Sequence, residues 1–153
     1  MDSSTRLESY FKESTKHIEH MIEAKEELIL PIDSYDNLKK IERFALNTLI
    51  FRFSKLQDLL GSKIFRHYLE YNGFSTIESS FFDILKELEK QSIIDIDSWN
   101  ELRELRNDIA HDYPDEFDEM IQKINLFVKK SDNLIDIAKK LEQKYCETNS
   151  KRD

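Results

Sequence analysis

The chain has 153 residues, which is the length of one typical domain. Two glycines, two prolines and 35% charged residues leave little turn material for a sheet and favour an all-α fold with long helices. The formal net charge of −8 argues against a protein that coats nucleic acid by bulk attraction, although it leaves room for a local basic patch.

The composition also indicates a cellular compartment. The single cysteine, Cys146, excludes an intrachain disulfide and suits the reducing cytoplasm. No apolar run approaches the roughly 18 residues of a membrane span, and the start of the chain carries no signal-peptide pattern. We therefore expect a cytoplasmic protein that does not enter the membrane.

The first half of the chain predicts two long helices. Apolar residues at three-four spacing predict the first over residues 3–29, and Pro31 stops it. Asp36 suits the N-cap of a second helix, which extends to residue 71. Asn72-Gly73 then supplies a C-terminal stop.

The second predicted helix is apolar on two arcs. The first arc contains Leu46, Leu49, Ile50, Phe53, Leu56, Leu60, Ile64 and Tyr68. The second arc contains Phe44, Phe51, Phe65 and Leu69. We expect the first arc to enter the core, whereas the second must be covered either by another helix of the same chain or by a second subunit. The pattern leaves both possibilities open.

Four basic residues form a stripe between these arcs, within about 80° of each other on a helical wheel. They are Arg52, Lys55, Lys63 and Arg66. An RNA backbone could lie along such a stripe. The same pattern is more often a solvated helix face, so both interpretations stay open.

Two shorter helices follow. The capping box Ser75-x-x-Glu78 predicts a helix that ends near Gln91. Residues 93–96 form an apolar connector. Asp97, or alternatively the capping box Ser98-x-x-Glu101, then opens a fourth helix.

The last predicted helix starts at Pro114, with the acids of residues 115–116 in its first turn, and it either continues or restarts after Ser131-Asp132. Residues 147–153 are expected to form a disordered tail. The whole pattern predicts one all-α domain over residues 1–146, an antiparallel bundle of about five helices.

Arg106 is the most informative residue, because it lies on an apolar arc of the fourth helix between Trp99 and Leu102. Burying part of a guanidinium costs free energy unless an anion or an acceptor meets it, so Arg106 needs a structural partner or a ligand. His111 follows in a final turn or connector, where its ring can turn towards the arginine. The pair combines a phosphate binder with an imidazole that titrates near neutral pH, which suits RNA cleavage without a metal.

The residues alone favour a structural interpretation, since an arginine and a histidine near a helix end are more often a salt-bridge member and a C-terminal cap. In the catalytic alternative, His111 deprotonates a ribose 2′-hydroxyl or protonates the leaving oxygen, while Arg106 stabilises the charge on the phosphate oxygens. Asn107 then holds the substrate or orients either partner. The sequence predicts no metal site and no cofactor.

The segment Arg106-Asn107-x-x-x-His111-x-Tyr113 resembles the Arg-polar-(four to six residues)-His signature of HEPN domains. The tyrosine two residues after the histidine resembles the HepT-like toxins of that superfamily. Two further segments look like that group: Leu102-Arg103-Glu104-Leu105, and Lys55-Leu56-Gln57-Asp58 with Gly61.

The resemblance implies a homodimer in which Arg106, His111 and the supporting Asn107 of both subunits form a ribonuclease site across the interface. It also implies a partner, a minimal nucleotidyltransferase antitoxin that transfers AMP to Tyr113. An anionic adduct beside the cleft would repel RNA. The expected protein is thus a metal-independent endoribonuclease toxin of a toxin-antitoxin system, which cleaves RNA by 2′-hydroxyl attack.

Two alternatives remain. Some HEPN proteins are non-catalytic helical partners, or substrate-binding subunits, of a minimal nucleotidyltransferase. The chain could also be a general helical interaction module in which Arg106 is only salt-bridged.

Overall fold

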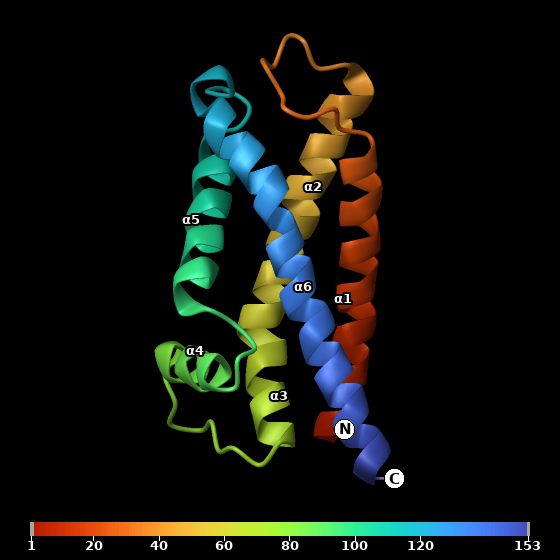
Figure 1. Ribbon diagram of the computed structural model, residues 1–153, viewed down its shortest axis with the longest axis vertical. Helices are drawn as coiled ribbons and strands as arrows, with labels where there is room; N and C mark the ends of the chain where they lie inside the picture. The colour runs from red at the N-terminus through yellow and green to blue at the C-terminus, as the bar shows by residue number, and fades with distance from the viewer. Residues whose placement is uncertain (1, 153) are drawn as a thin grey trace.

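A computed structural model describes residues 2–152 of the chain, and every regular element in that range is a helix (Figure 1). This confirms the predicted all-α class. The elements are α1 (Ser3–Glu26), α2 (Lys40–Leu59), the π-helical η1 (Leu60–Ile64), α3 (Phe65–Tyr71), α4 (Phe81–Lys90), α5 (Ile96–Asp112), the 3₁₀ turn η2 (Asp118–Met120) and α6 (Ile121–Arg152).

The α2, η1 and α3 segments form one continuous rod, because the residues at their junctions keep right-handed helical angles. The described chain therefore consists of five helical rods, as the sequence predicts. In Figure 1, α6 crosses in front of this long rod, between α5 and α1. The loops at residues 27–39 and 113–120 meet at one end of the bundle, and both termini lie at the other.

The long rod carries the centre of the core. Six residues of the first predicted arc are fully buried: Leu46, Leu49, Phe53, Leu56, Leu60 and Ile64. The Phe53 ring packs against Phe127 of α6, with 4.7 Å between ring centroids. Burial of this arc supplies much of the hydrophobic stabilisation that a bundle needs, since helices in proteins depend on tertiary packing.

The second predicted arc is divided between core and surface. Phe65 and Leu69 are buried within the chain. Phe44 and Phe51 lie seven residues apart on one face of α2, and their exposed fractions are 55% and 53%. The chain therefore covers half of this arc and leaves two phenylalanines in solvent.

The predicted starts of four helices are wrong. The long rod begins at Lys40 and not after Asp36, because a turn at residues 35–38 buries Leu38 before the helix starts. Asp95 caps α5 in place of Asp97, since its carboxylate accepts hydrogen bonds from Ser98 N and Oγ at 3.1 and 2.7 Å. The Asp95 cap satisfies a free N–H group of the first turn of α5.

The start of α4 is displaced in the same way. Ser80 is its N-cap, and Asp83 returns the bond, so the capping box used is Ser80-x-x-Asp83 and not Ser75-x-x-Glu78. Both Ser-x-x-acid patterns are equivalent on sequence. The second one opens the helix because its two side chains and two backbone N–H groups pair reciprocally at 3.1 Å.

Pro114 does not open a helix, which corrects the predicted start of the last one. Residues 113–117 form turns, and α6 begins only at Ile121. The turns bring the buried Phe117 against Tyr35 and Tyr113, with ring centroids 5.3 and 5.8 Å apart. This aromatic contact joins the two loops at one end of the bundle.

The first helix ends at Glu26, three residues earlier than predicted. The loop that follows is fastened to α6, because the Asn125 side chain accepts from the backbone N–H of Ile32 and donates to its carbonyl, both at 2.9 Å. The two-sided amide contact fixes the path of the loop over the end of the bundle.

The last helix continues through Arg152, where the sequence predicts a disordered tail from residue 147. Two contacts with Tyr71 account for the difference. The Tyr71 hydroxyl donates to Asn149 Oδ1 at 2.9 Å, and the Arg152 guanidinium lies 4.2 Å from the Tyr71 ring centroid. Residue 153 lies outside the described residues.

Within residues 2–152, no helix has the length and apolar character needed to cross a membrane.

Candidate functional site

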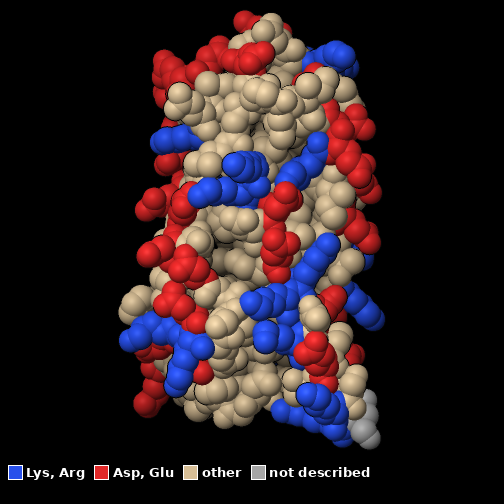
Figure 2. Space-filling model, in the orientation of Figure 1, with Lys and Arg blue, Asp and Glu red and all other residues tan. Residues whose placement is uncertain are grey.

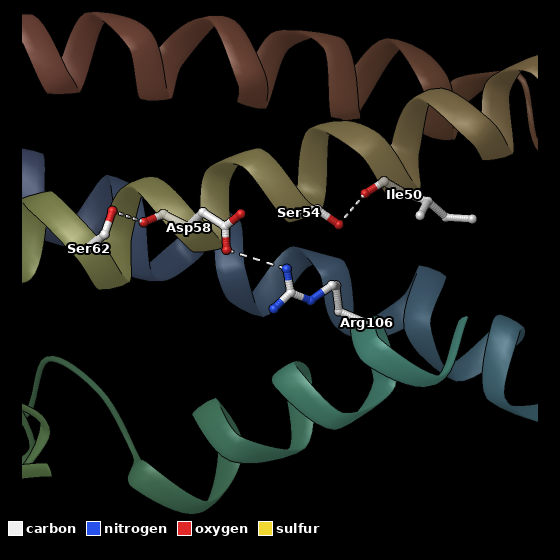
Figure 3. Close-up of polar contacts among 5 residues, drawn as sticks. All are labelled: Ile50, Ser54, Asp58, Ser62 and Arg106. Atoms are coloured by element: carbon white, nitrogen blue, oxygen red, sulfur yellow. Dashed lines mark hydrogen bonds and ion pairs between the residues drawn. The ribbon is translucent and has the colours of Figure 1, made fainter. Parts of the chain in front are cut away.

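Arg106 reaches from α5 to α2 and contacts Asp58 (Figure 3). The distance from Nη1 to Asp58 Oδ1 is 3.4 Å, which is long for a charged hydrogen bond. Only 19% of the Arg106 side chain is exposed, against 65% of Asp58. The buried Nε of Arg106 has no hydrogen-bond partner among the described residues. The guanidinium is thus held by one weak contact and keeps unused donors.

An open surface depression of about 660 Å³ lies beside this arginine. Its lining residues are Ser54, Arg106, Asn107, Asp108, Ala110, His111 and Asp112. All but Ser54 belong to α5. The depression is within the size range of ligand sites, and it brings together the three residues that the sequence proposes as catalytic. His111 lies in the final turn of α5, the first of the two predicted placements, and both His111 and Asn107 are exposed.

The depression carries both signs of charge. Asp108 lines it and pairs with Lys123 of α6 at 3.0 Å, so this carboxylate is partly compensated. Asp112 lines it as well and is half-buried. Figure 2 draws the face that carries α6, where basic and acidic side chains are interspersed. Among the lining residues of the depression Arg106 is the only Lys or Arg, so a phosphate there would depend on it in particular.

The Tyr113 hydroxyl faces the interior. Its ring packs against Tyr35 and Phe117, with ring centroids 6.3 and 5.8 Å apart. The hydroxyl oxygen is buried and has no hydrogen-bond partner among the described residues. Burial, followed by the neighbouring Tyr35, raises the pKa of Tyr113 to about 12. A modifying enzyme could reach this oxygen only after the turn at residues 113–117 opens.

Two members of the basic stripe have structural partners. Arg52 Nη1 donates to Nδ1 of the buried His17 on α1, at 3.2 Å. Arg66 donates to the carbonyl oxygens of Thr76 and Ser79, at 2.5 and 3.5 Å, and so holds the loop before α4. These contacts favour the structural interpretation of both arginines.

The two lysines of the stripe are exposed. Lys55 lies over the Phe51 ring at 5.6 Å, and Lys63 lies over Tyr10 of α1 at 5.5 Å. Arg52 and Lys63 thus lie beside α1, and Arg66 lies beside the loop before α4. None of the four residues lines the Arg106 depression, although Lys55 directly follows Ser54, which does.

A smaller recess lies on the other side of Arg106, with a volume of about 310 Å³. It is lined by Gln57, Asp58, Gly61, Ser62, Phe81, Trp99, Arg103 and Arg106. Sequence reasoning did not assign it. Gln57 follows Phe53 by four residues and precedes Leu60 by three, which places an amide on the buried face of α2. A polar residue among the apolar positions of this face is the one feature of the sequence that could have indicated the recess.

Comparison of the chain with protein-family models finds no match, and neither the curated proteins nor the solved structures compared with it are similar to it. The resemblance to HEPN domains therefore depends on the motif in α5. No group of three or more His, Cys, Asp or Glu side chains within residues 2–152 is placed to hold a metal ion.

Proposed function

We propose that this protein is a metal-independent endoribonuclease toxin whose site is built on Arg106 and His111, with Asn107 as the supporting polar residue. The observation that carries the proposal is the depression that all three residues line. A guanidinium with unused donors and an exposed imidazole both line this depression, where they supply a phosphate binder and a proton carrier, and the helix turns the two side chains roughly 140° apart.

In the proposed reaction, a neutral His111 takes the proton of a ribose 2′-hydroxyl. The 2′-oxygen then bonds to the adjacent phosphorus, and the bond from phosphorus to the 5′-oxygen breaks. A protonated His111 of a second subunit gives its proton to this leaving oxygen, while Arg106 stabilises the charge on the non-bridging oxygens. The products are a 2′,3′-cyclic phosphate and a 5′-hydroxyl. Exchange with water restores both imidazoles.

The exposed phenylalanines of α2 support the dimer in this proposal. Phe51 lies one helical turn before Ser54, which lines the depression. Phe44 lies two helical turns before Phe51 on the same face. A second copy that covers Phe44 and Phe51 would bury apolar surface next to the site. The two His111 side chains would then share one cleft.

The proposal includes a nucleotidyltransferase antitoxin that adds AMP to Tyr113. The phenol oxygen attacks the α-phosphorus of ATP, pyrophosphate leaves, and the phenol proton passes to solvent. Because the hydroxyl is buried, the antitoxin must bind a form in which the turn at residues 113–117 is open. Intact mass after incubation with the antitoxin and ATP should increase by one AMP in the wild type and stay unchanged in Tyr113→Phe.

A second candidate is a non-catalytic helical partner of a nucleotidyltransferase. The contact between Arg106 and Asp58 favours it, since this ion pair gives the arginine a structural role without any substrate. The two candidates differ in their prediction for RNA. Only the ribonuclease cleaves RNA, and only the ribonuclease requires His111 for its activity.

Regulated expression in a bacterial host tests the proposal. The wild type should arrest growth and degrade cellular RNA, and Arg106→Ala and His111→Ala should each abolish both effects. Arg6→Ala and His20→Ala are matched controls, because both residues are exposed on α1, and these variants should stay toxic. Growth arrest with RNA degradation in either site variant would reject the assigned roles. Circular dichroism shows whether each variant is folded.

A further inference from the structure

The recess between the long rod and α5 contains buried polar groups that the fold leaves unpaired. Gln57 is 2% exposed and Trp99 is 1% exposed. The amide nitrogen and oxygen of Gln57, and the indole nitrogen of Trp99, have no hydrogen-bond partner among residues 2–152. Buried polar side chains are nearly always paired, so three such atoms on two residues that line one recess require an explanation.

The other walls of the recess are aromatic and basic. Phe81 is half-buried, and its ring centroid lies 6.5 Å from that of Trp99. Arg103 is exposed at the edge, and Arg106 lines both the recess and the larger depression. The site therefore combines a ring face for stacking, donors and an acceptor for in-plane hydrogen bonds, and two cations.

Gly61 keeps the space between these groups open. A methyl group on Gly61 would lie 3.4 Å from Cζ2 of Trp99 and 3.6 Å from Cζ of Phe81. Both distances are ordinary contacts, so an alanine fits here without a clash and occupies part of the recess. Gly61 belongs to the π-helical turn η1, and such turns often occur at functional sites.

We propose that this recess binds the nucleobase next to the phosphate held by Arg106, an inference that rests on the proposed ribonuclease function. A nucleobase offers a flat ring to Phe81 and an edge with adjacent donors and acceptors to Gln57 and Trp99. Arg106 connects the two halves of the site, since it lines both hollows. The recess then gives the enzyme a base preference at one position of its RNA.

Trp99 allows a direct test, because it is the single tryptophan of the chain and it lines the recess. The full-length protein is titrated with AMP, GMP, CMP and UMP, and with inorganic phosphate, while tryptophan emission is recorded. At least one nucleotide should change the emission saturably, and phosphate alone should not. No change with any of the four at millimolar concentration, or the same change with phosphate, would overturn the proposal.

Three variants locate the binding. Gln57→Leu removes the amide while keeping a similar volume, and it should weaken nucleotide binding by about tenfold or more. Gly61→Ala should weaken it too, because its methyl group enters the recess. Gln122→Leu, on the exposed side of α6, is the matched control and should bind as the wild type does. Wild-type affinity in both recess variants would overturn the proposal.

Nucleotide binding and RNA cleavage, measured separately, distinguish a failure of the recess assignment from a failure of the proposed ribonuclease function. If nucleotides bind in a Gln57-dependent way and RNA is not cleaved, the recess stands as a nucleotide site and the ribonuclease proposal fails. If RNA is cleaved and Gln57→Leu leaves the base preference at the cleavage site unchanged, the ribonuclease proposal stands and the recess assignment fails.

Discussion

Arg106 Nη1 lies 3.4 Å from Asp58 Oδ1, and this ion pair links α5 to α2 between the two hollows of the surface. This ion pair explains why Arg106 can occupy an apolar arc of α5, because the carboxylate of Asp58 on another helix meets its guanidinium. Because Asp58 is largely exposed and the contact is long, solvent screens the pair, and it contributes at most about 1 kcal/mol to the free energy of unfolding. A phosphate can therefore replace Asp58 at the guanidinium.

Asp58→Asn should change the free energy of unfolding by less than about 1 kcal/mol and lower the KM for RNA by up to roughly fivefold, since Asp58 no longer competes with phosphate. Chemical denaturation and steady-state cleavage measure the two effects. Asp132→Asn, which removes an exposed ion pair with Lys25 away from the site, is the control and should leave KM unchanged. A higher KM in Asp58→Asn would mean that Asp58 positions Arg106 for catalysis.

Tyr113→Phe should raise the free energy of unfolding by about 1 kcal/mol, because it removes a buried hydroxyl that has no partner. Urea denaturation measures the change. Tyr71→Phe is the opposite control, since the Tyr71 hydroxyl donates to Asn149 and its loss should lower stability. If Tyr113→Phe destabilises the fold, the hydroxyl has a partner in solution.

His17 should make the fold sensitive to acid. Burial, followed by the charge of Arg52 and opposed by Glu13, lowers the pKa of His17 below its ordinary value of 6.5, and Lys55 adds to the lowering. The unfolded chain therefore binds a proton at a higher pH than the folded chain, so the free energy of unfolding falls as pH drops below about 6.5. His17→Gln should reduce this slope.

The control for His17 is His20, which is exposed on the same helix. His20→Gln should leave the slope of stability against pH as it is in the wild type. Thermal unfolding between pH 7.5 and pH 5 gives both slopes. Equal slopes in His17→Gln and the wild type would show that another group is responsible.

The exposed phenylalanines of α2 predict self-association. A Phe44→Glu, Phe51→Glu double variant should be monomeric at concentrations where the wild type is dimeric, and it should lose RNA cleavage with its fold intact. Ile77→Glu, a change at another exposed apolar residue in the loop before α4, should stay dimeric and active. Sedimentation equilibrium measures the association. A wild type that is monomeric at micromolar concentration would contradict the shared cleft.

The fold could be predicted largely from sequence because its signals are local. Three-four apolar spacing and the scarcity of glycine and proline predicted the helices, and the first arc of α2 is buried as expected. Helix starts were less predictable. Two similar capping boxes lie five residues apart before α4, and the choice between them depends on which one pairs reciprocally.

The site was predictable only in part. The motif placed Arg106 and His111 on one helix, and both line the depression. The partner of Arg106 is 48 residues away in sequence, on α2, and only the packing of two helices brings Asp58 to it. Burial of the Tyr113 hydroxyl and the recess at Gln57 likewise arise from contacts between distant segments, which no local pattern encodes.

Cleavage of a defined RNA by purified protein in the presence of a chelator tests the central claim most directly. The wild type should produce fragments that end in a 2′,3′-cyclic phosphate, and a 2′-deoxy substitution at the cleaved position should block the reaction. His111→Ala should lower the rate by about 10² to 10⁴. No cleavage by the wild type above the level of His111→Ala, or products without the cyclic end, would contradict the account.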